Sequence, residues 1–269
     1  MMQSKSTSNV KVIDVSHHQG AINWSLVKSD GVLGAYIKAT EGKTGLDEKH
    51  DDNAKGAAAA GLPVGFYHYA HPENNDPLAE AAKFVGAVKG YNAVFPHALD
   101  VEGKAGTVGA VKLTAWCMAW LQEVERLSGH PTMIYTGASF AKTYLGKQLA
   151  AWPLWIAHYG VEAPMANSTW DSWSVFQFTS SSNVKGIAGK VDLNAMENVF
   201  FERYTKCPKA NKGGYNLELI PVLINGKKLT DGLYDEKAGM TYVPVRIVAE
   251  IFGATVKWDS KLKRVEIVR

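Results

Sequence analysis

Short apolar runs alternate with amphipathic stretches along the first two thirds of the chain. Eight runs bounded by Gly, Pro, Asn or Asp are typical of buried strands, at 10–16, 34–40, 63–70, 97–102, 131–136, 153–159, 174–179 and 191–195. Helical patterns fall between the earlier runs, at 23–29, 46–60, 77–88, 111–127 and 139–149. The alternation predicts an α/β fold, an irregular (β/α) barrel of about eight strands and five helices. In such barrels the active site lies at the carboxyl ends of the strands.

The pattern changes at 205–215, where Pro, Gly, Lys and Asn become frequent, which is typical of a linker. Beyond this stretch, two apolar runs flank Asn225-Gly226, a strong hairpin signal, and a short helix (245–252) and further strands follow. The chain is therefore expected to comprise a flexible leader (1–9), the barrel (10–206), a linker (207–214) and a small C-terminal α+β domain (215–269).

Composition limits the classes of protein to consider. No apolar run approaches the roughly 20 residues of a membrane helix, and no apolar core follows the N-terminal residues as in a secretory signal. Two cysteines do not support a disulfide framework. Cys117 lies in a helical pattern and is expected to be a small residue of the protein core. The net charge is +3, and residues 209–269 carry 11 Lys+Arg against 7 Asp+Glu, which could favour an anionic surface.

Carboxylates at strand ends are the candidate chemistry. Asp100 and Glu102 are two apart on one strand, so they point to the same side with Cα atoms about 7 Å apart. Asp14 and Asp192 lie late in the first and last strands, which become neighbours when a barrel closes. Each interrupts an apolar strand, where burying a carboxylate is costly without a purpose. Crowding raises one pKa and so provides the proton donor that glycosidic bond cleavage needs.

Aromatic and basic side chains accompany these acids. Sugar rings stack on aromatic faces, so the late-strand aromatic residues are candidate substrate contacts, with barrel packing as the alternative; they are Tyr67, Tyr69, Tyr135 and Trp155. Lys38 is expected to pair with the acids. Gln177 is expected either to bond a sugar hydroxyl or to be a satisfied core amide.

Neither a metal nor a cofactor is expected. His68 and His71 are three apart on a strand and His17 and His18 are adjacent, so each pair faces opposite sides. The sequence contains no phosphate-binding glycine loop and no nucleophilic Ser or Cys motif.

Six segments, in order, resemble glycoside hydrolase family 25. They cover roughly residues 10–200 and read Asp14-Val15-Ser16-His17-His18-Gln19-Gly20, Ile37-Lys38-Ala39-Thr40-Glu41-Gly42, Gly65-Phe66-Tyr67-His68-Tyr69, Leu99-Asp100-Val101-Glu102, Trp155-Ile156-Ala157-His158-Tyr159 and Val191-Asp192-Leu193-Asn194. No single motif is decisive, but together they are specific. The resemblance implies an irregular five-helix β/α barrel that cleaves between N-acetylmuramic acid and N-acetylglucosamine, as in phage endolysins and bacterial autolysins.

The resemblance also implies roles for the acids. Glu102 would be the general acid, and Asp100 would stabilise the oxocarbenium-like transition state or orient the substrate N-acetyl group. Asp14 and Asp192 would complete an acidic ring. Whether the reaction runs through an enzyme nucleophile or through the substrate's acetamido group stays open, with acetamido assistance favoured.

Residues 215–269 resemble the stalk domain first described at the N-terminus of copper amine oxidases. This stretch contains no His or Cys, so no copper chemistry follows. Cell-wall attachment is the expected role, and a folding or oligomerisation module is the alternative.

The expected partner is Gram-positive peptidoglycan, with no nucleic acid and no membrane. The protein would be made in the host cytoplasm without a signal peptide and would act on the wall after release. Two other functions remain open: a wall-binding protein that no longer catalyses, which the intact set of acids argues against, and a related barrel hydrolase acting on chitin.

Overall fold

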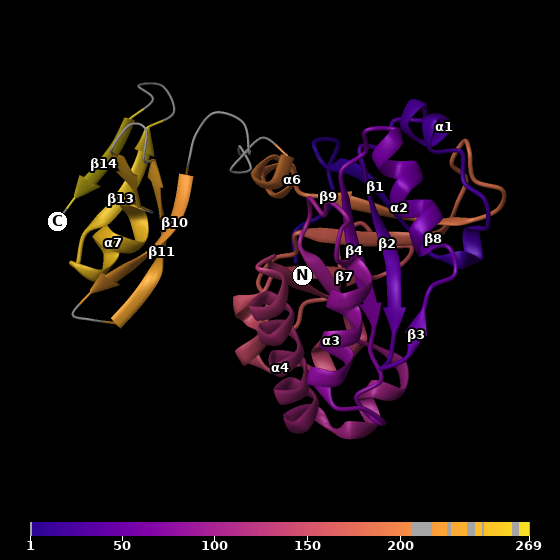
Figure 1. Ribbon diagram of the computed structural model, residues 1–269, viewed down its shortest axis with the longest axis horizontal. Helices are drawn as coiled ribbons and strands as arrows, with labels where there is room; N and C mark the ends of the chain where they lie inside the picture. Colours follow the sequence, from indigo (N-terminus) through magenta and orange to yellow (C-terminus); the bar gives the residue numbers. More distant parts are fainter. Residues whose placement is uncertain are drawn as a thin grey trace. The chain divides into compact units, whose positions relative to one another are not determined.

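The chain forms two compact units, Met1–Cys207 and Pro208–Arg269. We describe them from a computed structural model over residues 2–205, 217–224, 227–235, 240–243, 245–259 and 264–268 (Figure 1). Among these residues, no helix is both long and apolar enough to cross a bilayer.

The first unit is a closed barrel of eight strands. Parallel pairing runs from β1 through β2, β4, β5, β6 and β7 to β8, and β9 closes the barrel by pairing antiparallel with both β8 and β1. The strands are β1 Val10–Val15, β2 Gly34–Glu41, β4 Val64–Tyr69, β5 His97–Asp100, β6 Thr132–Gly137, β7 Leu154–Ala157, β8 Val175–Ser182 and β9 Val191–Met196. The predicted barrel is confirmed.

Helices occur at the five predicted places, with differences at their ends. They are α1 Trp24–Ser29, α2 His50–Ala59, α3 Pro77–Val88, α4 Ala110–Ser128 and α5 Ala138–Tyr144. The helix expected over 46–60 begins only at His50, because Gly45–Leu46 form β3, a short strand paired with β2. The helix expected over 139–149 is interrupted and continues as a 3-10 helix, Lys147–Ala151. α3 and α4 lie side by side outside the barrel (Figure 1).

A sixth helix, α6 (Asn198–Thr205), was not predicted. Its Phe200 is buried, and Phe201 and Tyr204 pack against the same cluster inside the barrel. That cluster includes Val10, which starts β1, and Met196, which ends β9. α6 therefore covers the end of the barrel opposite the carboxyl ends of the parallel strands.

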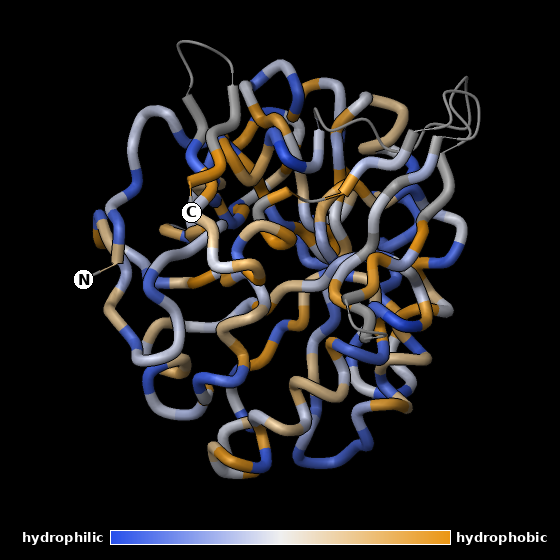
Figure 2. Tube along the Cα trace, turned by 90° about the vertical axis from the view of Figure 1, so that its left-hand side faces the viewer, coloured by the Kyte–Doolittle hydropathy of each residue, from blue (hydrophilic) through white to orange (hydrophobic). Residues whose placement is uncertain are grey.

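Alternation along the strands divides the apolar residues into two clusters. In β1, Ile13 and Val15 join the large cluster beneath the helices, whereas Val12 joins the cluster inside the barrel. Figure 2 shows the resulting mixture of hydrophobic and hydrophilic stretches along the trace. One step further along the inner face, apolar residues give way to polar ones: Val12 to Asp14, Ala98 to Asp100 and Val175 to Gln177. The sequence thus builds an apolar floor beneath a polar layer.

The N-terminal segment does not behave as the free leader that we expected. Met2 is buried, and the Gln3 side chain bonds with the backbone of Trp173 in both directions. Lys5 forms an ion pair with Glu162 at 2.6 Å. The segment is held against the loop before β8.

The second unit is a small α+β structure. It contains a three-stranded sheet, β10 Leu217–Ile224, β11 Lys227–Asp235 and β12 Met240–Tyr242, then helix α7 Val245–Ile251 and the hairpin β13 Thr255–Asp259 with β14 Arg264–Val268. Asn225-Gly226, Cys207 and the predicted linker lie outside the described residues. Cys117 is buried in α4, as predicted.

Candidate active site

A cavity of about 240 Å³ opens at the carboxyl ends of the parallel strands. All ten of the predicted site residues line it, together with three that the sequence reasoning did not select. The lining is Asp14, Lys38, Tyr67, Tyr69, Asp100, Glu102, Tyr135, Trp155, Gln177 and Asp192, with Ser16, His18 and Tyr159 in addition.

Asp14 and Asp192 face each other directly across the β1–β9 pair. Side chains opposed in this way have Cβ atoms about 4.5–5.5 Å apart. Asp14 is buried, and its Oδ2 accepts hydrogen bonds from the Gln177 and Asn194 amides, both at 2.8 Å. Burial raises the pKa of Asp14 to about 7, the charge of Asp192 adds to this, and the two amide donors oppose it. Burial also raises the pKa of Asp192.

Asp100 and Glu102 occupy the next sector of the cavity wall. β5 ends at Asp100, so Glu102 lies beyond the strand and not within it as predicted, although its backbone stays extended. Asp100 is 6% exposed, and its buried Oδ1 has no hydrogen-bond partner among the described residues. Burial, followed by the charge of Glu102, raises the pKa of Asp100 well above its usual value.

Glu102 is less buried than Asp100 and is therefore better placed to meet a ligand. Burial raises the pKa of Glu102, Lys38 lowers it, and Asp192 raises it further. A raised pKa favours the protonated form of a carboxyl group, which is the form that a general acid needs. Because the charge of Glu102 raises the pKa of Asp100, protonation of Glu102 favours ionisation of Asp100. With Glu102 protonated, the pair can supply both a proton and a negative charge to a bound substrate.

Lys38 is the basic side chain of this cavity. Its Nζ lies 2.7 Å from Glu41 Oε2 and 5.2 Å from the centre of the Tyr69 ring. It lowers the pKa of both Asp100 and Glu102. Lys38 was predicted to pair with the site acids. It forms a direct ion pair with Glu41 and acts on Asp100 and Glu102 through its charge.

The aromatic residues form the floor and sides. Trp155 is buried, packs against Tyr36 and Tyr135, and donates from Nε1 to Asn194 Oδ1 at 2.7 Å. The hydroxyls of Tyr135 and Tyr159 both donate to Gln177 Oε1, at 2.8 and 2.7 Å. Gln177 is thus a satisfied amide that fixes Asp14, and its contact with a sugar hydroxyl stays a prediction.

Sequence reasoning missed Tyr159 and Asn194. Asn194 stands two residues after Asp192 on the same face of β9, so strand alternation alone could have selected it. Tyr159 follows the end of β7, and nothing in the periodicity marks a residue outside a strand.

His68 and His71 have separate partners, whereas the rings of His17 and His18 lie 4.0 Å apart and do not face opposite sides as we expected. His68 is buried and bonds Glu80 and Thr40, both at 2.7 Å, on the side of α3. His71 bonds Glu41 and Glu73, both at 3.0 Å. Among the described residues, no group of three or more His, Cys, Asp or Glu is arranged to hold a metal.

A closed barrel that gathers four carboxyl groups and an aromatic floor at one mouth is the arrangement of a glycoside hydrolase. The family model described as glycosyl hydrolases family 25 matches residues 13–187. A second model, the copper amine oxidase N-terminal domain, matches residues 221–269.

Individual proteins agree with this. Lysozyme M1 of Streptomyces globisporus is 38% identical over 199 residues, which cover 70% of this chain and 68% of that protein. The autolytic lysozyme of Clostridium acetobutylicum is 36% identical over 185 residues, 69% of this chain and 55% of that protein. The crystal structure of the bacterial lysozyme from Streptomyces coelicolor is 32% identical, with a TM-score of 0.69, over 75% of this chain and 99% of that one. The chain belongs to glycosyl hydrolase family 25 and is a glycoside hydrolase of the lysozyme type.

Proposed function

We propose that this hydrolase cleaves the β-1,4 bond between N-acetylmuramic acid and N-acetylglucosamine in bacterial peptidoglycan, with Glu102 as general acid. The observation that carries the proposal is the pair at the end of β5, a buried Asp100 beside a more accessible Glu102 whose pKa is raised. Two carboxyl groups in different surroundings can divide the acid and charge-stabilising tasks between them.

In the proposed mechanism, Glu102 donates its proton to the glycosidic oxygen as the bond to C1 breaks. The acetamido oxygen of the same sugar attacks C1 and forms a cyclic intermediate. Asp100 accepts the acetamido N–H through its unpaired Oδ1 and stabilises the positive charge. The Glu102 carboxylate then takes a proton from the water that opens the intermediate. Asp14 and Asp192 complete the group of four carboxyl groups that line the cavity.

The second unit would act by binding the wall. Its family model matches residues 221–269, and residues 209–269 carry 11 basic against 7 acidic side chains. In this proposal the protein is made in the cytoplasm and meets peptidoglycan after release.

Glu102→Gln tests the catalytic assignment. The amide keeps the size of the side chain but holds no transferable proton, so release of reducing ends from soluble peptidoglycan should fall about 100- to 10,000-fold. Binding to walls, measured by co-sedimentation, should persist. The new reducing ends of the wild-type digest should be muramic acid, whereas glucosamine ends would indicate another bond.

Glu123→Gln is the matched control, because Glu123 lies on the outside of α4 in an ion pair with Arg126. It should retain wild-type turnover. A folded Glu102→Gln protein with similar turnover would refute the role of Glu102.

A further inference from the structure

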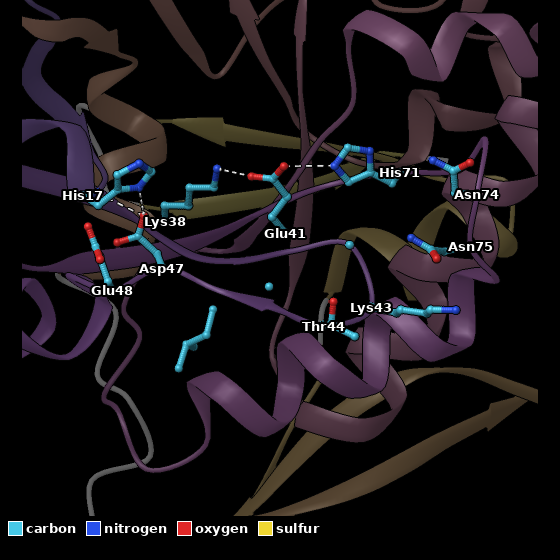
Figure 3. A pocket seen from close by; sticks show the side chains of 13 residues that line it. His17, Lys38, Glu41, Lys43, Thr44, Asp47, Glu48, His71, Asn74 and Asn75 are labelled. Atoms are coloured by element: carbon cyan, nitrogen blue, oxygen red, sulfur yellow. Dashed lines mark hydrogen bonds and ion pairs between the residues drawn. The ribbon is translucent and has the colours of Figure 1, made fainter.

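A second and larger hollow, of about 680 Å³, lies beside the catalytic cavity and shares Lys38 with it. Figure 3 shows its lining, which comes mainly from the segment 41–48 around β3 and from the turn after β4. His17 and Lys38 complete the side towards the barrel. Its volume falls within the range of about 300–1,000 Å³ typical of sites for small ligands.

The chemistry of this hollow differs from that of the catalytic cavity. Four tyrosines and a tryptophan line the cavity, whereas no Tyr, Trp or Phe lines the hollow among the described residues. Sugar rings bind by stacking on aromatic faces, so the hollow lacks the surface that another sugar of the glycan would need. Apart from Leu46 and two glycines, the lining residues are polar and carry both signs of charge.

Most of the wall is held rigidly by side chains that already have partners. Asp47 accepts from the His17 backbone and ring at 3.0 and 2.7 Å, and Asn75 donates to Glu80 at 2.7 Å. Gly42 has φ +54°, and a Cβ there would meet His71 at 3.2 Å and Asn75 at 3.3 Å. A backbone that approaches its neighbours this closely gives the hollow a fixed shape.

Three exposed polar side chains of the lining are not used in this way. Within the described part of the chain, Lys43, Thr44 and Glu48 form no hydrogen bond and no ion pair. Figure 3 shows Glu48 at one end of the hollow, and Lys43 with Thr44 towards the other. An occupant with an ammonium group and a carboxylate some distance apart would satisfy both ends.

We propose that this hollow binds the short peptide carried by muramic acid, with Lys43 contacting a peptide carboxylate and Glu48 an ammonium group. The inference rests on the proposed function, because the peptide is attached to the muramic acid whose glycosidic bond would be cut in the adjacent catalytic cavity. A peptide offers amides and charges of both signs and needs no aromatic platform. Occupation of the hollow would select peptide-bearing glycan over bare glycan.

The test uses the full chain and two soluble substrates, glycan strands with their peptides and the same strands after an amidase has removed them. The Lys43→Ala/Glu48→Gln double variant should lose about tenfold in kcat/KM on peptide-bearing strands, mainly through KM. On bare strands it should stay within about twofold of the wild type, and this also serves as the check of folding. The control is Lys112→Ala/Glu123→Gln, which removes the same charges from α4 and should change neither rate.

Each result is decisive for one of the two proposals. Equal loss on both substrates would assign the hollow to glycan binding, and unchanged rates on both would show that it binds nothing relevant. Either outcome overturns the peptide site and leaves the hydrolase function standing. A wild-type protein that cuts neither substrate would instead refute the proposed function.

Discussion

Burial of Asp14 and the facing carboxylate of Asp192 both raise the pKa of Asp14. Its pKa rises from 3.8 to about 7, so the folded state holds a proton that the unfolded state releases at lower pH. The unfolded state therefore binds fewer protons between these values, and the free energy of unfolding falls as the pH rises through this window. Asn does not titrate, so Asp14→Asn should gain stability relative to the wild type between pH 4 and pH 7.

Denaturant midpoints of the wild type and of Asp14→Asn, measured at pH 4 and pH 7, give this change in relative stability. A cost of repacking that does not depend on pH cancels between the two pH values. Asp171→Asn, an exposed position before β8, is the control and should show no such trend. A difference that shrinks as the pH rises would mean that Asp14 is ionised in the folded protein.

The charge of Lys38 affects the pKa values of Asp100 and Glu102. It lowers the pKa of Glu102 and of Asp100, so Lys38→Met should raise both. Activity that depends on protonated Glu102 is lost as the pH rises through its pKa. The alkaline limb of the kcat/KM profile should therefore move to higher pH in the variant. Lys112→Met on α4 should leave the limb unchanged, and a shift to lower pH in Lys38→Met would contradict this role.

The location of the site was predictable at the residue scale for a simple reason. Strand alternation and barrel closure put Asp14, Asp100 and Asp192 on one inner face, and the structure confirms that placement. The hydrogen-bond partners were not predictable, because which amide meets which carboxyl depends on side-chain positions across distant strands. Gln177 reaches Asp14 across 163 residues of sequence. The catalytic roles of the carboxyl groups stay predictions.

At the scale of elements, the strands were predicted well and the small additions were missed. β3 has only two residues, Gly45–Leu46, which is too short to show alternation. α6 contains two phenylalanines and a tyrosine, which are modest helix formers, and its stability depends on packing against the barrel. Local sequence signals therefore cannot reveal either element.

α6 should contribute to stability through its one buried side chain. Phe200 is 6% exposed, whereas its neighbour Val199 is 71% exposed. Phe200→Ala should lower the free energy of unfolding by about 3–5 kcal/mol, and Val199→Ala by less than about 0.5 kcal/mol. Tryptophan fluorescence in denaturant reports this, because seven of the eight tryptophans precede residue 206. Equal stability of the two variants would show that α6 does not close the barrel in solution.

At the scale of the whole molecule, we propose that chemistry and attachment are divided between the two units. The catalytic cavity and its supporting contacts lie within Met1–Cys207, and the second unit has its own sheet and helix. We therefore expect residues 1–206 alone to remain catalytically competent. Tethering a wall binder to a hydrolase raises the local concentration of substrate and leaves the catalytic groups unchanged.

Truncation after residue 206 should consequently slow attack on intact cells and barely change turnover of soluble glycan fragments. Since residues 209–269 carry 11 basic against 7 acidic side chains, part of the binding to an anionic wall should be electrostatic. Added salt screens such attraction, so the advantage of the full chain on cells should shrink as ionic strength rises. Equal loss on cells and fragments would make the second unit a structural part of the catalytic one, and a second unit that does not sediment with walls would remove its targeting role.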